Sequence, residues 1–81
     1  MEYEKDMERM KELYPNIKVI ILTTFDIEEY IFYAMKFRVD GYLLKGISMK
    51  DLSAAIRKVY NGSVVLNDSI TPKVVRMFSQ L

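Results

Sequence analysis

Two short apolar segments, each ending in a polar residue, constrain the fold of this chain more than any other feature. Val19-Ile20-Ile21-Leu22 leads into Thr23-Thr24, and Gly41-Tyr42-Leu43-Leu44 leads into Lys45. Neither segment alternates apolar with polar residues, so both faces of each strand are expected to be covered, as in parallel sheets. A helical stretch lies between the two segments. The sequence therefore predicts a β-α-β unit whose polar residues meet at the carboxyl edge of the sheet.

The composition limits the chemistry that this chain can perform. Its 81 residues include no Cys and no His, which excludes disulfides, thiolate or imidazole metal sites, and Ser-His or Cys-His catalysis. The 12 basic and 11 acidic residues leave a net charge of +1, and no basic tract suggests binding to nucleic acid. The hydrophobic fraction of 51% is high for one small domain, so either the core is unusually dense or some apolar surface is meant for a partner.

No segment of the sequence suggests a membrane protein. The longest uninterrupted apolar run, residues 19–22, is far too short to cross a bilayer. The first residues are acidic and helical in character and do not resemble a signal peptide. We therefore expect a cytoplasmic protein without membrane contact.

The remaining pattern predicts four helices and one further extended piece. An amphipathic helix is expected from about residue 2 to 13, ending before Pro15. Asp26 and Glu29 form a predicted capping box for a helix that ends near Arg38. Ser48 starts a third helix that stops at Asn61-Gly62. Residues 64–66 read as extended, and a last helix follows Thr71-Pro72, which gives the order α-β-α-β-α, a short extended piece, then α.

The helix after Asp26 is apolar on two faces. Besides its main apolar stripe it carries Tyr30, Tyr33 and Phe37 on a second face. A helix with two apolar faces is usually buried on two sides. We therefore expect Tyr30, Tyr33 and Phe37 to contact a second copy of the chain or another helix.

Three strings of the sequence together resemble the receiver domain of response regulators, most closely the LuxR/NarL type. Residues 13–26 are similar to its third helix and fourth strand, residues 41–45 (GYLLK) to its fifth strand, and residues 47–62 to its last helix. The resemblance implies an α/β fold, half of a flavodoxin-like doubly wound parallel sheet. It divides the chain into a truncated receiver domain (1–66), from the third helix to the extended segment, and a C-terminal linker helix (67–81).

The resemblance implies a switch function for three residues. In receivers the hydroxyl that matches Thr23 and the lysine that matches Lys45 contact the aspartyl phosphate, and the aromatic residue that matches Tyr42 swings inward when the hydroxyl moves. Each residue also has an ordinary explanation, as a strand-end or capping threonine, a solvated lysine and a half-buried core tyrosine. The resemblance favours the switch interpretation of Thr23, Tyr42 and Lys45.

The carboxylates on which receivers depend have no match in this sequence. Receivers hold Mg²⁺ with an acidic pair after the first strand and phosphorylate an Asp after the third, whereas the similarity here begins at the third helix. We therefore expect a fragment that is not phosphorylated, binds no metal or cofactor and is not an enzyme. A further departure is Phe37-Arg38 in place of the usual Ala-Gly, so that the usual left-handed glycine end of that helix is lost.

The sequence raises four hypotheses of function. The favoured one is a truncated receiver fragment of two-component signal transduction that acts as a dimerisation or interaction module, through the helix-strand-helix face that receivers use. The alternative is a phosphate- or nucleotide-binding βαβ module, but Thr23-Thr24-Phe25-Asp26 offers no glycine-rich turn. A flavodoxin-like enzyme is not favoured, because the chain lacks most of the nucleophiles and general bases that such an enzyme would use. DNA binding by this chain alone would require a helix-turn-helix, which the sequence does not contain. A histidine kinase or a full-length regulator are further partners that the resemblance implies.

The topology of receivers predicts how the fragment completes its sheet. With strand order 2-1-3-4-5, the strand at residues 19–22 is left with one unpaired edge when strand three is missing. We expect a twofold homodimer in which Val19–Leu22 of one copy pairs antiparallel with its mate, giving strand order 5-4-4′-5′. Val19, Ile20 and Ile21 are the predicted interface residues of this strand. A domain-swapped oligomer is a close variant. Proline at Ile20 or Ile21 is predicted to abolish dimer and fold together.

Overall fold

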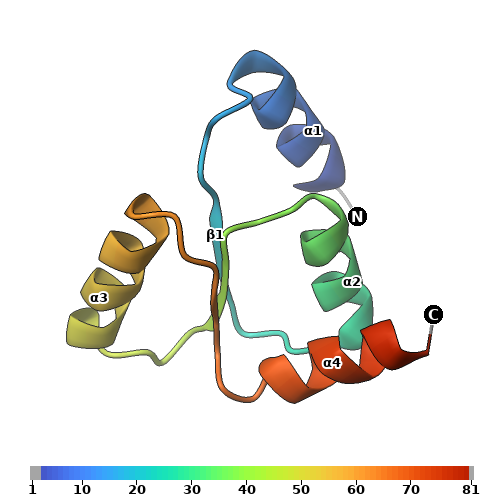
Figure 1. Cartoon of the computed structure of the whole chain (residues 1–81), viewed down its shortest axis with the longest axis vertical. Helices are drawn as coiled ribbons and strands as arrows, with labels where there is room; N and C mark the ends of the chain where they lie inside the picture. Colours follow the sequence, from blue (N-terminus) through green and yellow to red (C-terminus); the bar gives the residue numbers. More distant parts are fainter. Residues whose placement is uncertain (1–2, 81) are drawn as a thin grey trace.

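The computed structural model describes residues 3–80, which form an α/β fold of one parallel sheet and helices on both of its faces (Figure 1). Its elements follow the predicted order, and the short extended piece is a third strand. They are α1 (Tyr3–Leu13), β1 (Ile20–Thr23), α2 (Glu28–Lys36), β2 (Gly41–Leu44), α3 (Met49–Tyr60), β3 (Val65–Leu66) and α4 (Thr71–Ser79).

The sheet has the strand order β1-β2-β3, with all pairs parallel. Ile20 lies opposite Gly41 and Thr23 opposite Leu44, so β1 and β2 are paired over their full length. In Figure 1, α3 covers one face of the sheet, and α1, α2 and α4 lie on the other. This arrangement is consistent with half of a flavodoxin-like fold.

The main core lies between the sheet and α1, α2 and α4. Each of these elements contributes buried apolar side chains because its apolar stripe faces the sheet. The buried members are Met7, Ile31, Ala34, Val39, Tyr42, Ile70 and Val74. A smaller set outside this cluster, Leu43, Ala55 and Val59, is buried by α3 on the other face.

Asp40 fixes the beginning of β1 to the beginning of β2. Its carboxylate Oδ2 accepts a hydrogen bond of 2.8 Å from the Val19 backbone N–H. Its own N–H donates to the Val19 carbonyl at 2.8 Å. These two bonds set the β1–β2 register before the regular ladder begins, and they place the carboxyl ends of both strands at the same edge.

Helices α2 and α3 end in the same way although their sequences differ. The N–H groups of Gly62 and Ser63 donate to Val59 and Lys58, which is a Schellman motif with Gly62 at φ 98°. Arg38 takes the corresponding place after α2, at φ 56°, with a bond from its N–H to Met35. The expectation that α2 loses its left-handed end is therefore wrong: the conformation is kept without the glycine.

The left-handed Arg38 gives the first testable prediction. An arginine in this region costs about 1 kcal/mol relative to glycine because its Cβ crowds the backbone. Arg38→Gly is therefore expected to raise the free energy of unfolding by about 0.5–1 kcal/mol in urea titrations. Gly62→Ala, at the matching position of α3, should lower it by about 1 kcal/mol. An Arg38→Gly protein no more stable than the parent would contradict this account.

Candidate functional site

Two of the three predicted switch residues, Thr23 and Lys45, lie at the carboxyl ends of β1 and β2, whereas Tyr42 lies inside β2. Thr23 is the last residue of β1, and Lys45 directly follows β2. The Lys45 backbone N–H donates to the Thr23 carbonyl at 2.7 Å, so the two residues are neighbours across the sheet. The Lys45 side chain is exposed, whereas Thr23 is half-buried. Parallel pairing thus brings Thr23 and Lys45 to one edge, as the sequence predicts.

Thr23 and Tyr42 both bind the backbone of Phe25. The Thr23 hydroxyl accepts a hydrogen bond of 3.1 Å from the Phe25 N–H. The Tyr42 hydroxyl donates to the Phe25 carbonyl oxygen at 2.7 Å. The Tyr42 ring points into the core and is only 1% exposed. Thr23 and Tyr42 therefore fix the turn that leads from β1 to α2.

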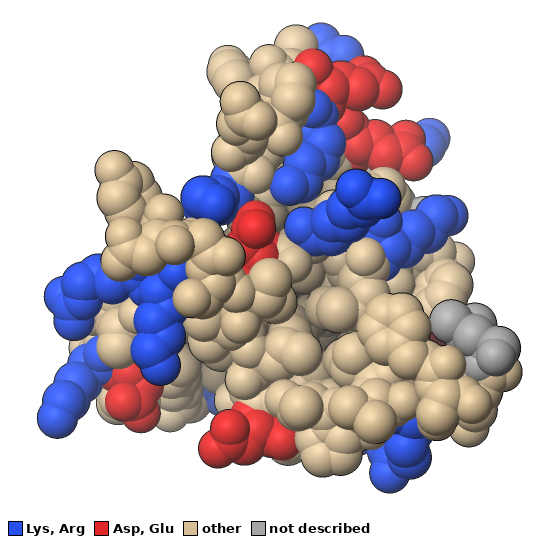
Figure 2. Space-filling model, viewed as in Figure 1, with Lys and Arg blue, Asp and Glu red and all other residues tan. Residues whose placement is uncertain are grey.

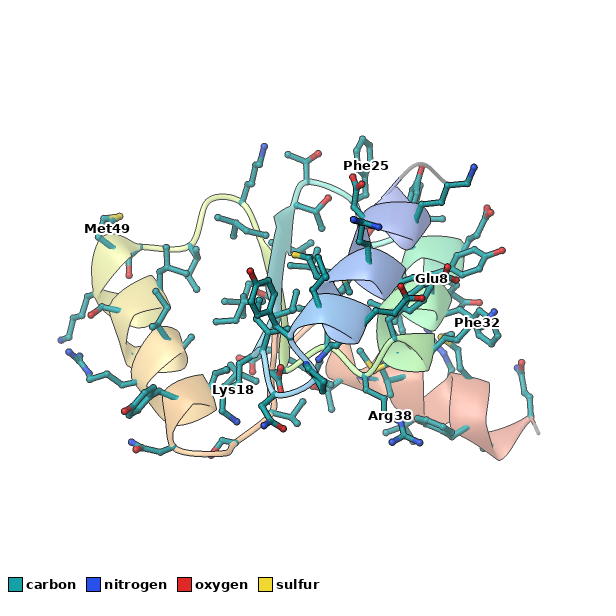
Figure 3. All side chains as sticks on the ribbon, turned by 90° about the horizontal axis from the view of Figure 1, so that it is seen from above. Glu8, Lys18, Phe25, Phe32, Arg38 and Met49 are labelled. Carbon is teal, nitrogen blue, oxygen red and sulfur yellow. The ribbon has the colours of Figure 1, made fainter. Side chains whose placement is uncertain are left out.

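Phe25 is a site residue that the sequence did not single out. Its ring is 53% exposed and projects from the end of the sheet, as Figure 3 shows. It also packs against Tyr30, with ring centroids 5.6 Å apart. Its importance lies in its backbone, and a sequence pattern gives no signal for a backbone group that accepts or donates.

An apolar cavity of about 390 Å³ adjoins the switch residues. It opens between α1, β1 and α2, and Thr23 and Tyr42 line it together with apolar neighbours. The lining residues are Met7, Ile21, Thr23, Phe25, Tyr30 and Tyr42. A displacement of Thr23 or Tyr42 therefore has free space to occupy on this side of the sheet.

Asp26 does not cap α2, and the predicted capping box is wrong. The helix begins at Glu28, with Ile27 as the N-cap residue and no side-chain hydrogen bond there. Instead the Asp26 carboxylate lies 3.0 Å from the Lys73 Nζ, which also donates to the Asp26 carbonyl at 2.9 Å. The hydrogen bond and the positive charge of Lys73 lower the pKa of the Asp26 carboxyl group from its ordinary value. Asp26 thus connects the turn between β1 and α2 to α4.

The predicted interface residues fall into two groups. Val19, Ile20 and Ile21 are half-buried at β1. On α2, Tyr30 and Tyr33 are half-buried, and the Tyr33 ring lies 5.8 Å from that of Phe32 in an edge contact. Phe37, just beyond α2, packs against the core. Tyr30 and Phe37 each line a hollow together with residues of α1, and Tyr33 is not among the residues that line these two hollows.

Strand β1 lies at the edge of the sheet. The carbonyls of Val19 and Thr23 accept from β2, so the odd-numbered residues of β1 direct their backbone groups toward β2. By the same alternation, the N–H and C=O of Ile20 and Leu22 face the outer side. Among residues 3–80 no strand pairs with β1 on that side.

No three acidic, cysteine or histidine side chains among residues 3–80 come together in a way that could hold a metal ion. Over the same residues, none of the helices has both the length and the apolar character that crossing a bilayer requires.

The chain is similar to proteins named oxygen regulatory protein NreC. It is 37% identical to that of Staphylococcus epidermidis, 36% to that of Staphylococcus aureus and 34% to that of Staphylococcus carnosus, in each case over 70 residues. Each match covers 86% of this chain and 32% of the relative, so the chain spans about a third of the length of these curated relatives. No protein-family model matches the chain. The similarities support the response-regulator relationship that the motifs indicate.

Proposed function

We propose that this chain is a non-enzymatic association module of two-component signal transduction, acting in the cytoplasm. Residues 3–66 supply the part of a receiver that responds to phosphorylation, and they associate as a homodimer through β1. A domain-swapped oligomer satisfies the same strand edge, and a histidine kinase or a full-length regulator is a further partner. The similarity to the NreC proteins supports the signalling class of this proposal.

The open edge of β1 is the observation that most supports association. The outward N–H and C=O groups of Ile20 and Leu22 are arranged to pair with another strand. Apolar surface adjoins this edge, because Leu22 is 41% exposed and Phe25 53%. Pairing two copies antiparallel about a twofold axis gives the strand order β3-β2-β1-β1′-β2′-β3′. This sheet differs from the predicted one by the addition of β3 at each end.

Substitution of Leu22 by proline or by alanine separates the contribution of its backbone N–H to dimerisation from the contribution of its side chain. Leu22→Pro removes an outward N–H and leaves the β1–β2 ladder intact, because proline is tolerated where an edge strand faces away from its neighbour. We expect it to weaken dimerisation about 100-fold in sedimentation equilibrium while circular dichroism stays unchanged. Leu22→Ala keeps the N–H and should lie within about fivefold of the parent. Equal effects of both substitutions would contradict strand pairing.

The proposal also holds that residues 3–66 contain the positions that respond to phosphorylation in receivers, but that none of these residues is itself phosphorylated. Asp26, the acidic residue just beyond β1, is held by Lys73. We therefore expect no gain in intact mass when the chain is incubated with acetyl phosphate and Mg²⁺. A gain on any aspartate that hydroxylamine removes would contradict this part of the proposal, and Lys45→Ala would then test whether the predicted phosphate contact takes part.

A further inference from the structure

Helix α4 packs on α2 through apolar side chains. Ile70 is fully buried and Val74 is 8% exposed, and they lie in one cluster with Ile31 and Ala34 of α2, which are also fully buried. Figure 2 shows a broad area without charge over α4 and the adjoining part of α2, at the lower right. Apolar contacts therefore provide much of the attachment of α4 to α2.

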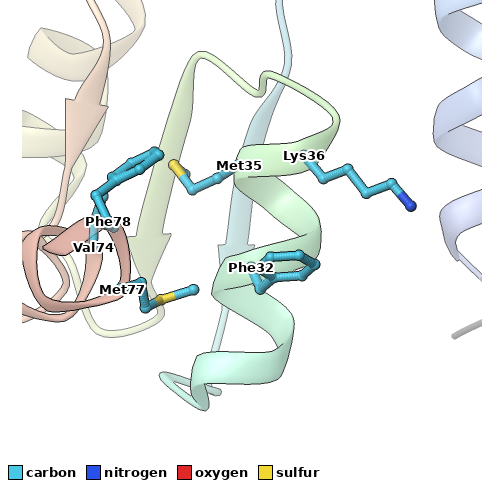
Figure 4. A pocket seen from close by; sticks show the side chains of 6 residues that line it. All are labelled: Phe32, Met35, Lys36, Val74, Met77 and Phe78. Atoms are coloured by element: carbon cyan, nitrogen blue, oxygen red, sulfur yellow. The ribbon is translucent and has the colours of Figure 1, made fainter. Parts of the chain in front are cut away.

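Two methionines face a cavity that remains between these helices. The Met35 sulfur points toward the Phe78 ring in Figure 4, and Met77 extends from α4 toward α2. Both methionines also pack against the main core. Because thioether sulfur makes favourable contacts with aromatic rings, the two side chains contribute to the attachment of α4. The cavity measures about 260 Å³ and is lined by Phe32, Met35, Lys36, Val74, Met77 and Phe78.

The cavity reaches the molecular surface. Phe32 is 51% exposed and Phe78 is 60% exposed, so two of the lining side chains border solvent. Met35 and Met77 are themselves half-buried. A small neutral molecule can therefore enter from solvent and reach both sulfur atoms while the chain is folded.

A polar atom inside this cavity would have no hydrogen-bond partner. Among the lining residues that the structure describes, only Lys36 has a side-chain donor. Its Nζ lies 5.9 Å from the centre of the Tyr33 ring, and in Figure 4 the side chain extends away from the cavity. An oxygen atom added to the sulfur of Met35 or Met77 would stay unpaired as long as α4 remains in place. Separation of α4 from α2 would bring that oxygen into contact with water.

We propose that Met35 and Met77 form an oxidation site at which hydrogen peroxide releases α4 from α2. A sulfur lone pair attacks one peroxide oxygen, and the S–O bond forms as the O–O bond breaks. The departing hydroxide takes up the proton of the transferred hydroxyl and leaves as water. Sulfur thus loses two electrons, peroxide gains them, and the product is methionine sulfoxide. Methionine sulfoxide reductases reverse the change with a thiol reductant. The inference does not depend on the proposed signalling function.

Release of α4 also affects the turn between β1 and α2. Lys73 of α4 binds both the carboxylate and the carbonyl of Asp26 in that turn. The Lys73 side chain is 26% exposed and that of Asp26 is 51% exposed, so water competes for the pair once α4 is loosened. Oxidation in the cavity therefore increases the mobility of Asp26 as well as that of α4.

Amide exchange after treatment with hydrogen peroxide tests the site. Peptide mass spectrometry should show one added oxygen at Met35 and at Met77, and exchange in residues 73–79 and at Asp26 should accelerate about tenfold. The variant Met35→Leu/Met77→Leu keeps the apolar volume and cannot be oxidised there, so treatment should change its exchange less than about twofold. Three results would overturn the proposal: no oxidation at these positions in the folded chain, oxidation without faster exchange, or equal acceleration in the leucine variant.

Met49 supplies the matched control. It is 78% exposed at the beginning of α3, and Figure 3 shows it on the opposite side of the molecule from α4. Met49→Leu should leave the acceleration by peroxide unchanged. Met77→Gln places a polar side chain in the cavity without any oxidant and should accelerate exchange in α4 about tenfold, whereas Met49→Gln should stay within about twofold of the parent.

The glutamine variants also decide the question if the leucine variant does not fold. Equal exchange in Met77→Gln and Met49→Gln would overturn the site. Acceleration throughout the chain, rather than in α4 and at Asp26, would show global unfolding instead of release of α4 and would overturn it as well.

Discussion

Ile21→Pro is expected to unfold the chain, in contrast to Leu22→Pro one residue away. The backbone groups of Ile21 are directed toward β2, and its side chain packs against the main core. Proline there removes a hydrogen bond from the β1–β2 ladder and truncates a core side chain. We expect a loss of roughly 3–5 kcal/mol in the free energy of unfolding, a large part of the stability of so small a domain.

Circular dichroism and urea titration of the two proline variants check this prediction. Ile21→Ala is the matched control, since it removes the same side chain and keeps the ladder hydrogen bond. The sequence alone predicted the same outcome for proline at Ile20 or Ile21. The register separates these positions, because only Ile21 uses its N–H within the chain. A native-like Ile21→Pro protein would show that β1 is not paired as described.

Tyr42→Ala is expected to have the other large effect. Tyr42 is among the largest fully buried side chains, and its removal leaves a cavity beneath the turn between β1 and α2. Replacing a large buried aromatic residue by alanine lowers the free energy of unfolding by about 3–5 kcal/mol. The hydroxyl that binds the Phe25 carbonyl is lost as well. We therefore expect Tyr42→Ala to be largely unfolded at room temperature by circular dichroism.

Tyr42→Phe separates the contribution of the buried ring to stability from the contribution of the hydroxyl. It keeps the ring and removes only the hydrogen bond, so we expect a loss of about 1 kcal/mol in urea titration. Amide exchange should accelerate at Phe25 and Asp26 while the rest of β1 keeps its protection. A Tyr42→Phe protein with unchanged exchange at the turn would mean that the ring alone positions it.

The order of the elements could be predicted because it depends on local patterns. Buried strands, the stop at Gly62 and the Ser48 cap are each recognisable within a few residues. The cap is observed, with the Asp51 N–H donating to the Ser48 hydroxyl at 3.1 Å. The Asp26 cap failed because its carboxylate has a stronger partner in Lys73, which lies 47 residues away in the sequence. A local pattern holds no information about such a partner.

The candidate site shows the same division between local and distant information. Thr23 and Lys45 could be placed at one edge because the carboxyl ends of adjacent parallel strands meet there. The hydrogen bonds of Thr23 and Tyr42 to the backbone of Phe25 could not be predicted, since they depend on backbone positions in a turn. The pairing of β3 with β2 rests on only two strand residues, too few to give a periodic signal.

The mass of the chain in solution tests the proposed β1 dimer most directly. Light scattering after gel filtration, over a series of micromolar concentrations, should give twice the chain mass of 9.6 kDa. The N–H groups of Ile20 and Leu22 should then be protected from exchange only at concentrations where the dimer forms. A folded protein that stays at 9.6 kDa throughout this range would contradict association through the open edge of β1.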